Sequence, residues 1–357
     1  MIWMFLAGLI ALVAGAELLV RAASRLATSM GISPLVVGLT VVAFGTSAPE
    51  IAVSVGAAMD GRTGLAVGNV IGSNILNVLL ILGLSALITP LVVNLQIIRQ
   101  EVPVMIGASV LVVVLALDGR VGSGDATLLL ALLVAYTVFL IVQSRGAPVE
   151  PARIAAGSDG ARPKPSGHWI VQLLLLLAGL MLLVMGSGWL VDAASVFARS
   201  LGVSDLVIGL TIVSAGTSMP EIATSVMAAL RKERDIAVGN VIGSNIFNLL
   251  GCLGLSGLVA PQGLEISQAV LAFDIWVMLA VAVACLPIFV TGREIARWEG
   301  AVFVTYYLAY TGYLILSAQQ HDALPFFSNV MLGFVAPLTV ITLVVTLIRP
   351  RHQSPPA

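Results

Sequence analysis

Hydrophobic residues form eleven long runs along the chain, separated by short polar stretches. A transmembrane helix needs about 20 consecutive apolar residues, and most of the runs come close to that length. The pattern therefore predicts an all-α polytopic membrane protein. The predicted helices cover residues 3–28, 34–59, 65–88, 102–117, 125–143, 170–198, 205–230, 236–259, 270–290, 298–317 and 327–348.

Composition supports this class of protein. Hydrophobic residues make up 59% of the 357 positions and charged residues only 10%, whereas soluble domains carry about 25% charged residues. The net charge of −1 offers no basic face for phosphates, which argues against a nucleic-acid partner. Cys252 and Cys285 both lie inside apolar runs, so we expect small core residues and no disulfide framework.

One long polar connection, residues 144–169, is rich in Pro, Gly and Arg and is predicted to be a flexible linker. It separates two five-helix units, 1–143 and 170–317, and residues 318–357 add an eleventh helix and a tail. With the N-terminus outside, fourteen of the seventeen Lys and Arg residues face the cytoplasm, and the outside keeps three, namely Arg62, Arg120 and Arg199. The positive-inside rule then predicts a cytoplasmic linker and C-terminus.

The two halves contain an internal repeat. Residues 38–87 align without a gap to residues 209–258, and about 32 of the 50 positions are identical. The copies lie five predicted helices apart, an odd number, so they cross the membrane in opposite directions. Inverted repeats are typical of secondary transporters, whose substrate site lies near the bilayer midplane between the repeats.

Each repeat places a proline and a glutamate in the middle of an apolar run, as AFGTSAPEIAVS in the first copy and SAGTSMPEIATS in the second. Pro49 and Pro220 have no N–H, so each is expected to free a preceding carbonyl of the helix. Gly45 and Gly216 are expected to let the backbone bend at the same place. Freed carbonyls at membrane depth need a partner, and a bound cation would satisfy them.

Oxygen-bearing side chains gather around these two breaks. Glu50 and Glu221 bring a formal charge of −2 to the bilayer centre, where a carboxylate is costly enough to indicate a functional site. Such oxygens suit Ca2+, whereas a softer metal would need nitrogen or sulfur ligands. The accompanying hydroxyl and amide side chains are Thr46, Ser47, Ser73 and Asn77 in the first repeat, and Thr217, Ser218, Ser244 and Asn248 in the second.

Each of these elements taken alone also has a purely structural interpretation. A membrane-helix proline is often a plain kink, the asparagines could bond neighbouring helices, and GNVIG is also a helix-packing motif. Glu17 precedes Arg21 by four residues, which favours a surface ion pair over a ligand. Asp274 is taken to have no acidic counterpart in the first repeat. Two glutamates in register, without a basic residue at matching depth, favour an ion site.

GTSAPE and GTSMPE, each followed by GNVIGSNxxN, resemble the two alpha repeats of the sodium/calcium exchangers in the cation/calcium antiporter superfamily, most of all its compact prokaryotic branch. The resemblance implies a ten-helix core in which helices 2, 3, 7 and 8 form the site and helices 1 and 6 slide across it. It implies shared Ca2+ and Na+ ligation by Glu50 and Glu221. It further implies mainly Na+ ligation by Thr46, Ser47, Thr217, Ser218, Ser73 and Ser244, completion by Asn77 and Asn248, and backbone carbonyl ligands at Ala43 and Ser214.

Two features depart from the family. Asn occupies both central amide positions, where some relatives place an aspartate, which puts K+ dependence and a proton-linked variant in doubt. The eleventh helix lies beyond the family's ten.

The resulting hypothesis is a secondary active antiporter, and not an enzyme, that exchanges Na+ for Ca2+ by alternating access and extrudes Ca2+ electrogenically. The alternative is an antiporter for H+ and Ca2+, or for another divalent cation, on the same fold. Its partners are the transported ions and the lipid bilayer of a bacterial or archaeal cytoplasmic membrane, with no further cofactor. A monomer suffices for transport in this hypothesis, and homo-oligomers are compatible with it.

Overall fold

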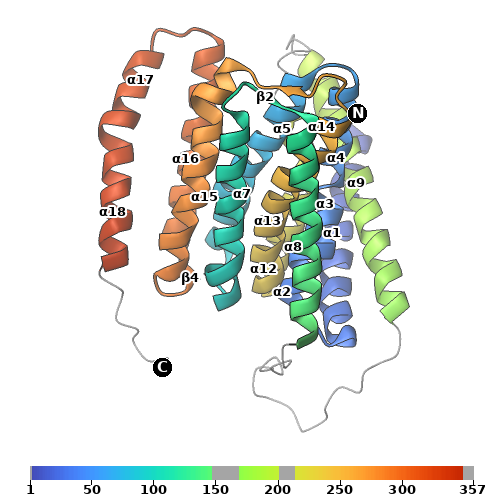
Figure 1. Ribbon diagram of the computed structural model, residues 1–357. Coiled ribbons are helices and arrows are strands. Elements are labelled where there is room, and N and C mark those ends of the chain that lie inside the picture. The colour runs from blue at the N-terminus through green and yellow to red at the C-terminus, as the bar shows by residue number, and fades with distance from the viewer. Residues whose placement is uncertain (1, 147–168, 201–213, 349–357) are drawn as a thin grey trace.

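The computed structural model describes residues 2–146, 169–200 and 214–348, and these residues are almost entirely helical (Figure 1). Nine helices in these ranges are long and apolar enough to cross a membrane, and one bent helix pair makes a tenth span. The described part of the predicted helix 205–230 begins at Ser214 and includes the short apolar helix Met219–Leu230. The rest of that helix and nearly all of the linker lie outside the described residues.

The first repeat begins with α1 (Ile2–Met30) and ends with α8 (Ser123–Gly146). Several of its spans contain a π-helical turn, marked η, where the backbone is wider than in an α-helix. The elements between are α2 (Pro34–Val37), η1 (Gly38–Val42), α3 (Ala43–Thr46), α4 (Ala48–Met59), α5 (Thr63–Leu76), η2 (Asn77–Leu82), α6 (Gly83–Ile88), β1 (Leu91–Val92), η3 (Ile97–Glu101), α7 (Val102–Ala116) and β2 (Arg120–Val121).

The second repeat begins with α9 (Trp169–Ser200) and ends with α16 (Arg297–Ala318). Its order of elements matches that of the first repeat. Between the two lie α11 (Ser214–Thr217), α12 (Met219–Leu230), α13 (Arg234–Ile246), η5 (Phe247–Cys252), α14 (Leu253–Val259), β3 (Leu264–Glu265), η6 (Val270–Asp274), α15 (Ile275–Val290) and β4 (Glu294–Ile295). The eleventh span follows as α17 (Leu324–Val330), η7 (Met331–Val335) and α18 (Ala336–Ile348).

Short antiparallel strand pairs tie the two repeats together. β1 of the first repeat pairs with β4 of the second, and β2 of the first pairs with β3 of the second. Because β1 and β3 occupy equivalent places in the two repeats, as do β2 and β4, each pairing is the inverted copy of the other. The inverted five-helix repeats predicted from the sequence are therefore confirmed.

Helices α1 and α9 are equivalent members of the two repeats, and they run in opposite directions against one another (Figure 1). Glycines bring their backbones together. A Cβ atom on Gly8 would lie 2.9 Å from the carbonyl oxygen of Gly186, and one on Gly15 would lie 2.8 Å from that of Gly179. Small residues allow this close packing of membrane helices, and here they fix how the two long helices cross.

The core surrounds the second repeat's GNVIG helix. The apolar part of Arg234–Val259 is buried throughout, whereas the apolar part of Leu324–Val345 has no buried residue. GNVIG packs closely against the second span, since a Cβ on Gly243 would lie 2.7 Å from the carbonyl oxygen of Leu39. The packing function that the sequence allowed for this motif is thus present.

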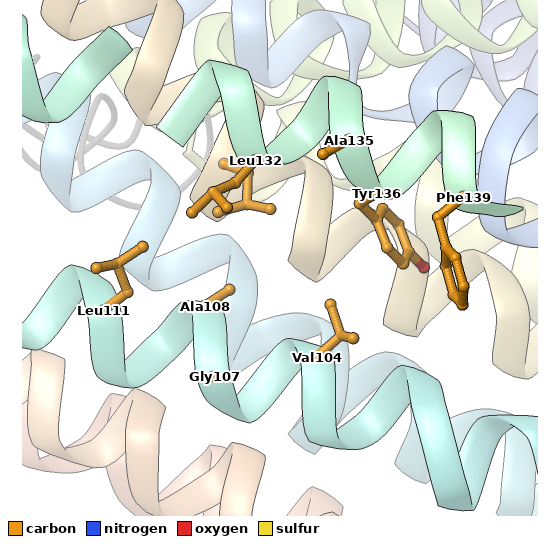
Figure 2. Close-up of a pocket in the computed structure, with 9 residues that line it drawn as sticks. Val104, Gly107, Ala108, Leu111, Leu132, Ala135, Tyr136 and Phe139 are labelled. Atoms are coloured by element: carbon orange, nitrogen blue, oxygen red, sulfur yellow. The ribbon is translucent and has the colours of Figure 1, made fainter. Parts of the chain in front are cut away.

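The eleventh span packs on the outside of the second repeat. α18 contacts α15, and the side chains of Tyr306 and Thr339 hydrogen-bond to one another. In the first repeat the equivalent place, between α7 and α8, is an uncovered groove of about 380 Å3 (Figure 2). Leu132 in that groove occupies the position that Tyr306 has in the second repeat. α18 therefore covers the second copy of a surface that stays open in the first.

Candidate ion-binding site

Both spans that carry the GTSxPE motif are broken at the same residue. The helix interrupts at Ser47 in the first repeat (φ −79°, ψ 3°) and at Ser218 in the second (φ −86°, ψ 5°). The two parts of the first span, Pro34–Thr46 and Ala48–Met59, meet at an angle of 43°. Pro49 and Pro220 are each the second residue of the new helix, where a missing N–H breaks no helical hydrogen bond.

The expectation that Gly45 and Gly216 provide the bend is therefore wrong, since the break lies two residues later. These glycines make room for α9 instead. A Cβ on Gly45 would lie 3.0 Å from the Leu180 side chain, and one on Gly216 would lie 2.0 Å from Cγ2 of Val191. The Ser187 hydroxyl of α9 also donates to the carbonyl oxygen of Gly216 at 2.5 Å.

Glu50 and Glu221 lie one turn after the two breaks, in the first turns of α4 and α12. Both are buried, with 0% and 1% of their surface exposed. The N-terminal turn of a helix carries a partial positive charge that favours an anion. The positive N-terminal ends of α4 and α12 therefore lie next to the carboxylates of Glu50 and Glu221. The half-helix that precedes each break ends in the same region with a partial negative charge.

Each glutamate is held by a serine of the other repeat. Ser47 donates to Oε1 of Glu221 at 3.1 Å, and Ser218 donates to Oε1 of Glu50 at 2.8 Å. Both pairs follow the repeat offset of 171 residues, so each bond is the inverted copy of the other. Oε2 of each glutamate is buried without a hydrogen-bond partner. The arrangement leaves one oxygen of each carboxylate available for a cation.

A second set of hydrogen bonds holds the side chains of Thr46 and Thr217. Thr46 donates to Oδ1 of Asn240 at 3.1 Å, and Thr217 makes the equivalent bond to Oδ1 of Asn69 at 3.5 Å. The amide of Asn69 bonds to Ser54, and that of Asn240 bonds to the equivalent Ser225, both at 2.9 Å. Asn69 and Asn240 therefore connect the threonines of one repeat to the helices of the other.

The remaining predicted ligands lie in the same buried region with different partners. The Ser73 and Ser218 hydroxyl oxygens lie 3.3 Å apart, and Asn77 donates to Asn245 at 2.9 Å. Ser244 and Asn248 are buried with side-chain polar atoms that lack partners.

The two predicted backbone ligands are the carbonyl groups of Ala43 and Ser214. The Ala43 carbonyl accepts from the Ser47 N–H at 3.1 Å, and the Thr46 hydroxyl lies 3.4 Å from the same oxygen. Ser214 is the first residue of α11, at the edge of the described residues.

The chemistry of this region is that of hard oxygen donors. Two carboxylates supply a charge of −2, and no salt bridge to either is found among the described residues. Those residues also contain no group of three or more His, Cys, Asp or Glu side chains that could hold a metal ion. Hydroxyl, amide and carbonyl oxygens around two carboxylates match the preference of Ca2+ better than that of softer metals.

A second pair of intramembrane carboxylates escaped the sequence analysis. Glu101 ends η3 and accepts from the Tyr136 hydroxyl at 2.6 Å, and Asp274 ends η6 and accepts from the Tyr310 hydroxyl at 2.8 Å. The expectation that Asp274 has no acidic counterpart is therefore wrong. The sequence does contain a signal, since AYT occurs at both tyrosines, residues 135–137 and 309–311.

Glu101 also shows why the predicted helix 102–117 starts too late. The segment Gln96–Glu101 is polar enough to resemble a loop, yet the span begins at Ile97. Glu101 is completely buried and accepts from the side chains of Gln96 and Gln100 at 2.9 and 3.0 Å. Three neutral donors thus satisfy this carboxylate inside the helix bundle.

Glu17 is confirmed as the partner of Arg21, and Arg231 also bonds to it. Arg231 lies in the turn between α12 and α13, so this ion pair connects α1 with the second repeat. Its side chains are partly exposed, whereas Glu50 and Glu221 are buried. Glu17 is a packing contact and not a member of the site.

Comparisons with known proteins agree with this geometry. The family model described as sodium/calcium exchanger protein matches residues 1–142 and 171–316. The chain is 38% identical over 316 residues to a putative antiporter, CaxA, of Alkalimonas amylolytica, covering 88% of this chain and 98% of that protein. It is 35% identical over 336 residues to the sodium/calcium exchanger MaX1 of Methanosarcina acetivorans, covering 85% and 95%.

A solved structure of the sodium-calcium exchanger NCX_Mj, soaked with 10 mM Na+ and 10 mM Sr2+, superimposes with a TM-score of 0.75 at 32% identity, covering 87% of this chain and 97% of that one. The family model stops at residue 316, before the eleventh span. With two inverted repeats, a paired glutamate motif and matches over most of its length, the chain belongs to the sodium/calcium exchanger family of membrane transporters.

Proposed function

We propose that this protein exchanges Na+ for Ca2+ by alternating access, with both ions competing for Glu50 and Glu221. One observation carries the proposal. The two glutamates are buried in register, each is held through Oε1 by the other repeat, and each has an unpartnered Oε2. Ca2+ neutralises their combined charge of −2, so the occupied site can cross the membrane barrier without net charge.

The proposed ligand set combines this geometry with the resemblance to the family. Ca2+ binds between the two carboxylates, and Na+ uses the hydroxyl oxygens that surround them. The amide oxygens of Asn77 and Asn248 complete the centre, and the carbonyl oxygens of Ala43 and Ser214 lie at the ends of the half-helices. The hydroxyl ligands proposed for Na+ are those of Thr46, Ser47, Thr217, Ser218, Ser73 and Ser244.

The empty site has a cost that favours coupled exchange. Two like charges buried without a cation are unfavourable by at least several kcal/mol. The bonds from Ser47 and Ser218 and the N-terminal turns of α4 and α12 offset part of this cost. Movement of the empty site is therefore disfavoured relative to movement with bound ions. With more than two Na+ per Ca2+, exchange moves net charge, and the membrane potential helps Ca2+ leave the cell.

We further propose a cytoplasmic-membrane location with the N-terminus outside and residues 144–169 in the cytoplasm. The distribution of Lys and Arg supports this orientation. The end of α8, the start of α9 and the end of α18 lie at one end of the molecule, opposite the start of α1 (Figure 1). In this assignment residues 1–143 and 170–317 are the two functional halves, and residues 318–357 are an accessory segment. One chain supplies both glutamates, so a monomer suffices for transport.

The test is Ca2+ uptake into proteoliposomes loaded with Na+, compared with vesicles that contain Na+ on both sides. Uptake that requires the outward Na+ gradient and increases with an inside-positive potential supports electrogenic exchange. Glu50→Gln and Glu221→Gln should each abolish uptake while the protein remains folded in detergent. Equal uptake without a Na+ gradient removes Na+ as the driver, and a pH gradient in Na+-free buffer then tests the H+-coupled alternative. Wild-type rates in either Gln variant contradict the site assignment.

A further inference from the structure

Many hydrogen bonds of the site obey the inverted symmetry of the repeats, but those between the asparagines do not. Asn77 donates through Nδ2 to Oδ1 of Asn245 at 2.9 Å. The equivalent bond, at an offset of 171 residues, joins Nδ2 of Asn248 to Oδ1 of Asn74. That bond is absent in this conformation, and both of its atoms are buried without a partner. The same four asparagines thus occur in two different arrangements.

Asn74 and Asn245, the asparagines next to these central amides, also differ from one another. Asn245 directs its own amide across to the Met105 sulfur on α7 at 3.5 Å, whereas Asn74 turns its amide back to the carbonyl oxygen of Val70 in its own helix at 2.8 Å. Met278 on α15 stands where Met105 stands in the first repeat, at an offset of 173 residues. It is buried, and α15 packs against α5, which carries Asn74. The partners that would let Asn74 adopt the arrangement of Asn245 are therefore in place.

The bond from Asn245 also decides what Asn77 can do. It occupies Nδ2 of Asn77, and Oδ1 of the same amide is buried without a partner. An amide fixed through its nitrogen presents its oxygen, which is the atom that a cation needs. Asn248 has neither of its polar side-chain atoms bonded. One central amide is thus oriented by its neighbour while the other is not.

Two arrangements built from identical residues in inverted repeats have similar energies, because each replaces one set of bonds by its copy. We propose that Asn74 and Asn245 are positioning residues that hold the central amides in turn. Asn245 holds Asn77 in this conformation, and Asn74 holds Asn248 in the conformation that faces the other side of the membrane. The inference rests on the proposed alternating access, and it adds two residues that are not themselves ligands.

The experiment compares Asn74→Ala with Asn245→Ala in vesicles of known orientation. Each variant loses a contact of its own amide nitrogen in both conformations, but it removes the bond between two asparagine side chains from only one of them. The loss of that one bond shifts the equilibrium between the conformations by about five-fold. Because apparent affinity scales with the population of the binding-competent state, the ratio of half-saturating Ca2+ concentrations on the two faces should change about five-fold, in opposite directions for the two variants. The double variant should return the ratio close to the wild-type value.

Ser85→Ala is the matched control, since Ser85 is buried on the same span as Asn74 without a hydrogen-bond partner. It should leave the ratio unchanged. If an Ala variant does not fold, Asn→Ser at the same position replaces it. A residue that only stabilises the fold would weaken both faces equally. Equal changes on both faces, or changes in the same direction for the two variants, would overturn the proposal.

A second readout separates this inference from the proposed function. In a Ser244→Cys background, a membrane-impermeant thiol reagent is applied from each side in turn, and the fraction of labelled protein is measured. Asn74→Ala and Asn245→Ala should shift this fraction in opposite directions, whichever ion is transported. If the wild type does not transport Ca2+ but the labelling shifts are opposite, the proposed function fails and the positioning role stands. Unshifted labelling in an active protein rejects the positioning role.

Discussion

The contact between α9 and the second motif provides a quantitative test of the structure. Gly216 lies two residues before the break at Ser218, and its carbonyl accepts a hydrogen bond from Ser187 of α9. A Cβ at this position would lie 2.0 Å from Cγ2 of Val191. At the equivalent position of the first repeat, a Cβ on Gly45 would lie 3.0 Å from Cδ2 of Leu180. Gly216→Ala and Gly45→Ala are thus the same change with different expected costs.

The size of the difference follows from these distances. Carbon atoms in contact lie about 3.5 to 4.0 Å apart, so Gly216→Ala requires a movement of about 1.5 Å. Overpacking of this kind costs about 1 to 3 kcal/mol, and replacing a helical glycine by alanine returns about 1 kcal/mol. We expect a net loss of about 1 kcal/mol, and at most about 2 kcal/mol, in the free energy of unfolding for Gly216→Ala. For Gly45→Ala the end of the leucine side chain can move, and we expect a change close to zero.

The assay is the melting temperature in detergent together with the initial rate of Ca2+ uptake. Gly216→Ala should lower the melting temperature by several degrees and reduce uptake, because Thr217 is displaced with it. Val191→Ala removes the methyl group that clashes, so the double variant should recover most of both losses. Equal melting temperatures for Gly45→Ala and Gly216→Ala, or no recovery in the double variant, would show that the contact with α9 is not as close as the structure has it.

Two further predictions concern parts of the molecule outside the ion site. Tyr136→Phe leaves Oε2 of the buried Glu101 without its donor, which costs about 1 to 3 kcal/mol of stability. Tyr310→Phe should cost less because Asp274 is only partly buried. Equal losses of thermal stability in the two variants would contradict this prediction. Removal of residues 319–357 deletes the eleventh span, whose apolar stretch has no buried residue. Na+-dependent uptake should therefore persist, with at most a small drop in melting temperature. Loss of uptake in a folded truncated protein would assign the span an essential role.

Much of the fold could be predicted from the sequence because hydrophobic length and the internal repeat are strong signals. Eleven apolar runs and an odd repeat offset are sufficient to predict two inverted halves. The described residues agree with ten of the runs and with the inversion, and residues 205–213 of the remaining run lie outside them. The two glutamates stand out in the sequence because a carboxylate in an apolar run is costly unless it serves a function. Their pairing with Ser47 and Ser218 follows from the repeat only after the two halves are placed in space.

Other features depend on contacts that one sequence does not reveal. Gly45 and Gly216 suggest a bend because glycine is flexible, but the distances to Leu180 and Val191 show that its small size matters here. The predicted start of the fourth span is wrong because Glu101 looks like a loop residue until its three donors are known. A carboxylate satisfied by neutral side chains carries no charge pattern that marks it as buried.

The hydrogen bonds of Ser47 and Ser218 to the glutamates join the two repeats to one another. Ser47 and Glu221 belong to different repeats, as do Ser218 and Glu50, so neither repeat holds its own glutamate through these bonds. If the repeats move relative to one another, the two bonds are strained together. A cation bound to both free Oε2 atoms would take over this connection, because it joins the same two repeats through stronger charge interactions. In the proposed mechanism, bound ions would keep the halves together while the bonds between the repeats rearrange, and the empty site would have no such replacement. If the two serine–glutamate bonds break in the same step, as their inverted symmetry suggests, the proposed coupling between ion binding and movement would follow from that symmetry.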